Sequence, residues 1–216
     1  MSPIKRKIFI VSGIILIAAG CVLTAYNISE DYKASSSSAS VLSQIDEQRE
    51  ELSSKNEYDT SDVSSNASDV WNNEQTDDEI DPDTPMPTVT VDGYQYIGTL
   101  VIPPLEIELP VADDWDYTRM KISPCRFSGS VYRNDIVVCA HNYSSHFRDI
   151  GSLQVGDEVV FIDVLGNEFH YKVGQVETLG ATAVEEMTSS DWDLSLFTCN
   201  YSGRARVTVR CKRVDE

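Results

Sequence analysis

The feature that most constrains this chain is an apolar segment near its N-terminus. Residues 8–28 contain no charged side chain, and Lys5, Arg6 and Lys7 lie directly before them. About 20 apolar residues are enough to cross a bilayer as a helix, and basic residues on one side favour a cytoplasmic location for that end. The sequence therefore predicts that residues 1–28 form a cytoplasmic basic tip and a single-pass transmembrane anchor in the cell membrane, with the rest of the chain extracellular.

Two other interpretations of this segment stay open. A cleaved secretory signal has a shorter apolar region, of about 7 to 15 residues, before a small-residue cleavage site. Residues 18–21, Ala-Ala-Gly-Cys, also resemble a lipoprotein processing site in which Cys21 would carry the lipid. With an anchor helix or with a lipid, the following domain is tethered outside the membrane.

Residues 29–90 differ in composition from the segments on either side. They hold 16 acidic and 3 basic residues, which is −13 of the chain's formal charge of −18. A segment of low hydrophobicity and high net charge cannot bury enough apolar area to offset chain entropy. We therefore expect a disordered acidic stalk, in which the apolar residues between 41 and 52 support at most a short transient helix without a partner. The charge belongs mainly to this stalk, and no nucleic acid is expected to bind.

Residues 91–216 are expected to form one folded domain made of short β-prone runs separated by turns. The runs predicted to be strands are 94–102, 105–110, 135–141, 158–163, 168–173, 175–179, 194–199 and 206–212. A turn at residues 165–167, Leu-Gly-Asn, predicts a hairpin, and the stretches 147–153 and 183–187 are compatible with short helices. The pattern predicts an all-β sandwich or barrel and does not separate the two.

A strand-turn-strand unit near the C-terminus carries a candidate nucleophile. Cys199 ends the run 194–199, and Arg204 and Arg206 lead into the next run. A strand end can expose a thiol while holding it rigidly, and a nearby cation favours the thiolate and stabilises a developing oxyanion. His141 ends an upstream β-prone run, so pairing of the two strands would bring an imidazole next to the thiol.

The other cysteines and histidines are interpreted as structural. Cys125, Cys139 and Cys211 lie in apolar surroundings, where cysteine is usually a small buried hydrophobe. A disulfide between Cys139 and either of the other two stays conceivable in an oxidising exterior. His146 is at most a helper, and His170 is expected to face solvent. The chain has no Cys-x-x-Cys or His-x-x-x-His spacing, so neither a zinc site nor a cofactor is expected.

These residues carry a resemblance to a known family. Residues 195–199, Ser-Leu-Phe-Thr-Cys, resemble the Thr-Leu-x-Thr-Cys signature of sortases, the Gram-positive cysteine transpeptidases. The segment around His141 is similar to the family's histidine segment, and residues 206–209 resemble its arginine strand. Residues 96–103 are similar to the opening of the sortase domain.

The resemblance covers roughly residues 91–214 and departs from the family pattern in two places. Ser195 replaces the first threonine of the signature, and Ala140 stands where glycine is common before the histidine. Both replacements exchange one small residue for another. They leave the sortase subclass undecided.

The resemblance implies a fold and a set of catalytic roles. It implies the closed eight-stranded sortase β-barrel, with Cys199 as nucleophile, His141 as acid and base, and Arg206 as the oxyanion-binding cation. Arg206 fits this role better than Arg204 because it begins the hydrophobic-x-hydrophobic run of the last strand. Arg210, like Lys212, is then expected to be a solvated surface charge.

The resemblance also implies a substrate and a reaction. A sortase cleaves an LPxTG-like sorting motif through a thioacyl intermediate and transfers the surface protein to an amine, from a wall-precursor peptide or a pilin lysine. Thr198, Ala140 and Asn142 flank the catalytic pair and are candidates for substrate binding. Trp192 is either a groove wall or a core anchor. Some sortases bind calcium, and the acidic residues here are scattered, so no metal is expected.

A second class of function stays open beside the enzyme. The domain could be a catalytically silent, membrane-tethered β-domain that binds envelope components. A binding module has no reason to keep Cys199, His141 and Arg206 together, and the enzyme is therefore preferred.

Overall fold

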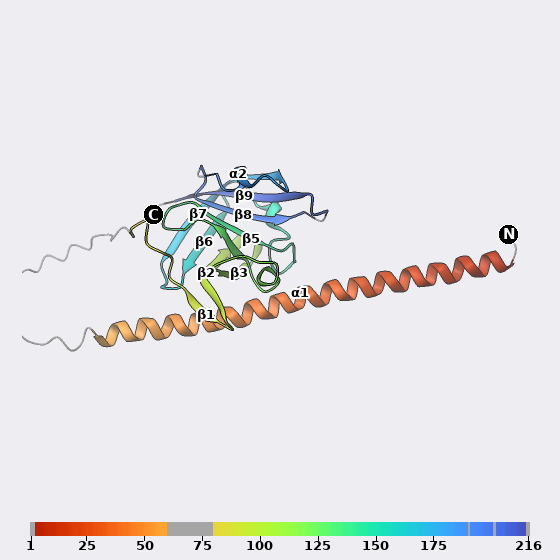
Figure 1. The fold of residues 1–216 in the computed structure, drawn as a ribbon, viewed down its shortest axis with the longest axis horizontal. Helices are drawn as coiled ribbons and strands as arrows, with labels where there is room; N and C mark the ends of the chain where they lie inside the picture. The colour runs from red at the N-terminus through yellow and green to blue at the C-terminus, as the bar shows by residue number, and fades with distance from the viewer. Residues whose placement is uncertain (1–2, 60–79, 190, 201, 215–216) are drawn as a thin grey trace, which may run out of the picture.

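The computed structural model of the chain describes residues 3–59, 80–189, 191–200 and 202–214. One long helix, α1 (Pro3–Asp59), runs beside a β-barrel (Figure 1). The N-terminal half of α1 projects beyond the barrel, whereas its C-terminal half lies along it (Figure 1). The apolar part of α1 is long enough to cross a membrane by length and composition, and its side chains are exposed.

Eight strands close into a ring. Their order is β2 (Tyr94–Ile102), β3 (Ile107–Ala112), β4 (Cys125–Ser128), β5 (Ile136–Ala140), β8 (Leu194–Cys199), β9 (Ala205–Arg213), β7 (Glu168–Gly180) and β6 (Glu158–Asp163). Pairing of β2 with β6 closes the ring, and β1 (Val89–Val91) pairs with the start of β2. The pairs β3–β4 and β5–β8 are parallel, and the other pairs are antiparallel. The structure thus confirms the closed eight-stranded barrel.

Short helical turns connect the strands. They are η1 (Pro103–Leu105), η2 (Arg119–Lys121), η3 (Ile150–Ser152) and α2 (Val184–Met187). The last two lie within the stretches for which short helices were compatible with the sequence.

The barrel interior is a continuous apolar core. Leu100, Ile136, Leu196 and Val209 come from four different strands, and each is 0% exposed. Their burial follows from strand geometry, in which alternate side chains point to opposite faces. Gly98 permits the closure of the ring, because a Cβ there would clash with a carbonyl oxygen of β6.

Strand positions agree with the sequence in most places. The bounds of β2, β6 and β8 are those predicted. The two runs predicted at 168–173 and 175–179 form the single strand β7, with a bulge between Val173 and Gln175. β4 was not predicted, because four residues after a proline show no useful periodicity. β1 was also missed, and Met86 already belongs to the core, so the folded domain begins before residue 91.

The structure corrects the prediction of a disordered stalk. Residues 29–59 continue α1 without a break, whereas residues 60–79 of the predicted stalk lie outside the described residues. Ala34, Val41 and Ile45 lie three to four residues apart in phase and are nearly fully buried. They face β1 and the adjoining strands, and Val41 and Ile45 share a buried apolar cluster with them. A helix in an acidic segment is stabilised by such tertiary packing of one face more than by propensity.

Candidate active site

Three neighbouring strands carry the predicted catalytic residues. β5 and β8 run in parallel with Ala140 opposite Thr198, so His141 and Cys199 each follow directly after this pair. Antiparallel pairing of β8 with β9 sets Cys199 opposite Arg206. The Thr198 hydroxyl donates a hydrogen bond to the Ala140 carbonyl oxygen at 2.8 Å, which ties the two strand ends together. Backbone register therefore brings an imidazole, a thiol and a guanidinium to one edge of the barrel.

His141, Cys199 and Arg206 line one pocket of about 260 Å³. The rest of its wall is mostly apolar and comprises Trp115, Tyr117, Met120, Phe127, Cys139, Ala140, Ala181, Ala183, Val184, Met187 and Phe197. Cys199 is partly exposed, and Arg206 Nη1 donates to the carbonyl oxygens of Gly203 and Ala205, both at 3.4 Å. Arg204 is exposed in the preceding turn. A reactive polar edge beside an apolar hollow is suited to hold an acyl substrate with apolar side chains.

The His141 imidazole is oriented by the loop of residues 113–118. A hydrogen bond with the Tyr117 backbone holds the ring, and Nε2 is buried without a hydrogen-bond partner among the described residues. Burial lowers the His141 pKa, the positive charge of Lys121 lowers it further, and the Tyr117 hydrogen bond opposes both. A neutral imidazole with an unoccupied nitrogen is suited to accept a proton inside the pocket.

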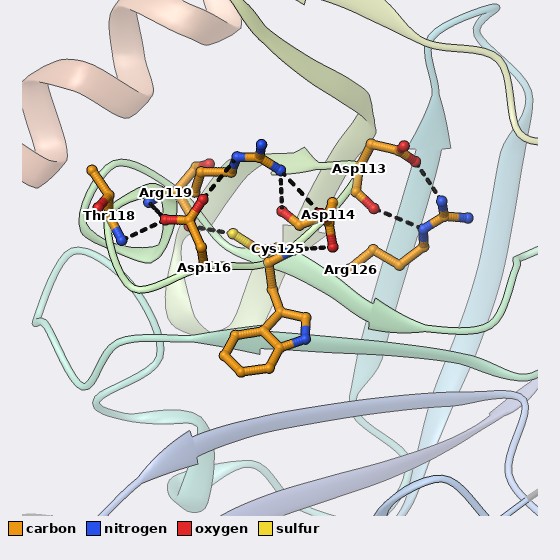
Figure 2. A network of polar contacts seen from close by, with 9 residues as sticks. Asp113, Asp114, Asp116, Thr118, Arg119, Cys125 and Arg126 are labelled. Carbon is orange, nitrogen blue, oxygen red and sulfur yellow. Dashed lines mark hydrogen bonds and ion pairs between the residues drawn. The ribbon is translucent and has the colours of Figure 1, made fainter.

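Ion pairs hold this loop in shape. Figure 2 shows Arg119 between two carboxylates, with Nε 3.1 Å from Asp116 and Nη1 3.5 Å from Asp114. Asp116 also accepts the backbone N–H groups of Thr118 at 2.6 Å and of Arg119 at 2.9 Å. The loop therefore keeps its shape through its own side chains and not through a strand ladder.

Aromatic side chains of the loop form the outer wall of the pocket. Trp115 is 39% exposed, and its ring lies 5.5 Å from that of Phe127, which in turn lies 5.3 Å from Phe197 on β8. Arg126 pairs with Asp113 at the start of the loop (Figure 2). The wall is thus packed onto the same strand that carries Cys199.

Arg210 is an internal clamp, which corrects its prediction as a solvated charge. Its side chain is 2% exposed, and Nε donates to Glu177 at 2.9 Å. Nη1 donates to the Met187 carbonyl oxygen at 2.9 Å and to Ser195 Oγ at 2.8 Å, and Nη2 donates to the Glu186 carbonyl oxygen. Because α2 contributes to the pocket wall, Arg210 holds that wall against β8 and β9. Lys212 is about half exposed.

Burial distinguishes Cys199 from the other thiols of the domain. Cys125, Cys139 and Cys211 are buried, and desolvation raises their pKa values, to about 12 for Cys125 and Cys211. Cys125 lies opposite Cys139 across β4 and β5, yet both thiols are free, as is Cys211. Cys21 is free and exposed on α1. Neither conceivable disulfide is formed, and buried neutral thiols are poor nucleophiles.

The remaining predicted residues divide between the pocket and other places. Ala140 lines the pocket, and Thr198 is a buried tie behind it. Asn142 is partly exposed and does not line this pocket. Trp192 lies elsewhere: its ring packs against Gly174, and Lys212 Nζ is 5.8 Å from its centroid. Trp192 is therefore a packing anchor and not a pocket wall.

Two further sequence predictions concern titratable groups away from the pocket. His170 forms ion pairs with Glu158 and Glu168 on the β6–β7 surface. Among the described residues, no cluster of three or more histidine, cysteine, aspartate or glutamate side chains is placed to hold a metal ion. The structure therefore gives no support for a calcium site.

Sequence reasoning missed the loop wall. Trp115 and Tyr117 alternate with aspartates in residues 114–117, and this pattern predicts neither a strand nor a helix. Exposed aromatic residues in a polar loop are themselves a signal of a binding surface, because they have no core to enter.

The fold and the site define a class of protein: a closed β-barrel that sets a cysteine, a histidine and an arginine together for acyl transfer. A family profile described as the Sortase domain matches residues 100–214, which is more than half of the chain. The chain therefore belongs to the sortase family, whose members are cysteine transpeptidases.

Solved structures agree with this fold. Sortase A from Corynebacterium diphtheriae is 18% identical with a TM-score of 0.52, and the match covers 57% of this chain and 62% of that one. Sortase C of Streptococcus pneumoniae is 22% identical with a TM-score of 0.51, over 56% and 70% of the two chains. Sortase C from Clostridium perfringens SM101 is 26% identical with a TM-score of 0.49, over 56% and 71%.

The comparisons leave two matters open. The similar structures include sortases A, C and D, so the subclass stays undecided. A comparison with curated proteins finds no match.

Proposed function

We propose that this protein is a membrane-anchored transpeptidase that cleaves an LPxTG-like sorting motif and joins the acyl part to an amine. The observation that carries the proposal is the register of β5, β8 and β9. It sets His141 and Cys199 on adjacent strand ends and Arg206 opposite Cys199, all on one pocket.

In the first half-reaction, the thiolate of Cys199 attacks the carbonyl carbon that follows the motif's threonine side chain. Arg206 stabilises the negative charge that develops on the carbonyl oxygen. His141 holds the proton from the thiol and donates it to the leaving amine as the C–N bond breaks. A thioester between Cys199 and the acyl part remains.

In the second half-reaction, an amine attacks this thioester. His141 takes the proton from the incoming amine, a new C–N bond forms, and the Cys199 thiolate leaves. The amine comes from a wall-precursor peptide or a pilin lysine, and water in its place gives slow hydrolysis. This chemistry requires no cofactor.

The proposed topology places the N-terminus in the cytoplasm and the barrel outside. Lys5, Arg6 and Lys7 before the apolar part of α1 support this orientation. We propose that residues 1–28 are the anchor and that the barrel is the catalytic domain.

The experiment that tests the function replaces the nucleophile. The full-length protein in detergent is incubated with an LPxTG-type peptide and an amine, and the products are weighed by mass spectrometry. We expect cleavage, exchange and a thioacyl adduct in the parent protein and in a Cys21→Ala control, and none of them in Cys199→Ala. Full activity of Cys199→Ala would remove this residue from the mechanism.

The alternative function is a silent envelope-binding domain. It predicts that the parent protein binds the peptide without forming a covalent adduct. Hydroxylamine trapping separates the two, because hydroxylamine releases an acyl hydroxamate only from a thioester.

A further inference from the structure

The long helix contacts the barrel directly beside the candidate active site. Asp31 of α1 accepts hydrogen bonds from Ser144 Oγ, from the Ser145 backbone at 3.2 Å and from Ser145 Oγ at 3.1 Å. It also lies 3.6 Å from Arg148. These partners belong to the turn that follows His141, so the start of the docked part of α1 is tied to the catalytic edge.

The contact continues along the helix. Ser38 Oγ donates to the Ile122 carbonyl oxygen at 2.6 Å and lies 3.4 Å from Nε2 of the buried His146. Ala34, Val41 and Ile45 form the buried stripe described above. Buried apolar area and a satisfied hydroxyl make this a packed interface, because each unpaired polar atom there would carry a desolvation cost.

The far end of the contact fixes the direction of the barrel. Arg49 Nη2 donates to the Asp163 carbonyl oxygen at 3.2 Å, at the hairpin between β6 and β7. From Asp31 to Arg49 the helix rises by about 27 Å at 1.5 Å per residue. The barrel therefore lies along α1 with its catalytic edge toward the N-terminal, apolar half and the β6–β7 hairpin away from it, as the arrangement in Figure 1 shows.

The catalytic edge also lies level with the end of the apolar segment. Ile28 is the last apolar residue before Glu30, and the rise from Ile28 to Asp31 is only about 4.5 Å. Tyr143, two residues after His141, interacts electrostatically with Tyr26 and Glu30 of the helix. Tyrosines are enriched at the membrane–water boundary, and Tyr26 is 61% exposed there.

We propose that α1 is a continuous strut that holds the catalytic edge of the barrel at the bilayer surface and facing it, so that the protein acts on peptide bonds held close to the lipid headgroups. The substrate part of this inference rests on the proposed function. The orientation part rests only on the docking of α1 and on insertion of its apolar half. A peptide whose motif lies far from its membrane tether would then meet the pocket less often than one whose motif lies next to it.

The orientation is tested by energy transfer in vesicles, with the full-length protein carrying Cys21→Ala and Cys199→Ala. A donor dye is placed either at Ser202→Cys, beside the pocket, or at Leu165→Cys, in the β6–β7 hairpin. The acceptor is attached to the headgroups of phosphatidylglycerol and phosphatidylcholine vesicles. We expect clearly stronger transfer from residue 202 than from residue 165. Equal or reversed transfer would overturn the proposal.

Helix length provides the second arm. Seven helix-forming residues inserted after Ser29 raise the docked barrel by about 10 Å and nearly preserve the helical phase. Transfer from residue 202 should fall, whereas the same seven residues inserted between residues 70 and 71, after the end of α1, should leave it unchanged. Unchanged transfer in the first insertion would show that α1 is not a strut.

The consequence for substrates is measured with intact Cys199. A sorting peptide is attached to a lipid through a short or a long spacer, and the same peptide is also supplied free. The insertion after Ser29 should slow cleavage of the short-spacer peptide at least tenfold and leave the free peptide unaffected. Equal rates on the short-spacer peptide would contradict the proposal, whereas absence of all cleavage in every variant would contradict the proposed chemistry and not the orientation.

Discussion

The two sides of the pocket are held by different forces. The strand side carries His141, Cys199 and Arg206, and backbone ladders between β5, β8 and β9 set their positions. The loop side carries Trp115 and Tyr117, and ion pairs among nearby side chains set theirs. Reacting groups thus sit on the rigid side, where small displacements would cost most in rate. The loop side can change its sequence without changing the chemistry.

The largest expected effect belongs to the strand side. Removing one group that stabilises an oxyanion lowers kcat by about 100- to 1,000-fold. Arg206→Ala should show such a loss in steady-state peptide cleavage, while its unfolding free energy stays close to the parent value. Arg204→Ala is the matched control from the same turn, and an equal loss in that variant would refute the assignment to Arg206.

The next effect concerns the clamp that joins the two sides. Arg210→Met leaves the Glu177 carboxylate and two carbonyl oxygens without their donor, and breaking a buried ion pair in this way costs about 3 kcal/mol. Denaturant unfolding monitored by circular dichroism measures the loss. Lys212→Met, on the same strand and exposed, should change stability by less than about 1 kcal/mol. Comparable losses in both variants would mean that Arg210 is not a clamp.

A smaller effect is expected from the loop side. Exposed ion pairs contribute about 0.2 to 1 kcal/mol, so Arg119→Met should loosen the Trp115 wall and raise KM by less than about tenfold, with kcat changing much less. Kinetics on the same peptide separate the two constants. Arg133→Met removes another exposed pair, away from the pocket, and should change neither. A fall in kcat alone would place Arg119 among the groups that position His141.

The smallest effect is electrostatic. The positive charge of Lys121 disfavours the imidazolium form of His141, so Lys121→Met should raise the His141 pKa. The protonated form then persists to a higher pH than in the parent protein. The imidazole resonances followed by NMR during a pH titration report the change, with Lys212→Met as control. A pKa that stays the same or falls would show that Lys121 does not act on this ring.

Sequence alone predicts most of the strand side. The bounds of β8 and the strand end at Cys199 follow from an alternating apolar pattern and a turn, which are local signals. The approach of His141 was predicted on the condition that its strand lies beside β8, and the pairing of Ala140 with Thr198 fulfils that condition. The resemblance to sortases supplied the closed barrel that the pattern did not distinguish from a sandwich.

Sequence reasoning failed where burial depends on distant partners. Arg210 was predicted to be solvated because arginine usually is, yet carbonyl oxygens of α2 and Glu177 of β7 surround it. Residues 29–59 were predicted to be disordered from their charge, yet the stripe at Ala34, Val41 and Ile45 finds a partner in the barrel wall. Composition averages over a segment and does not register one buried face.

The amino-acid sequence by itself determined the apolar helical segment, the main strands and the three groups proposed for catalysis, because each depends on neighbours within about ten residues of the chain. Only the tertiary structure decided that the barrel closes between β2 and β6, that Trp115 and α2 wall the pocket, and that α1 docks beside the turn after His141. Those features arise from contacts between residues far apart in the chain, whose free energies exist only once the whole fold has brought them together.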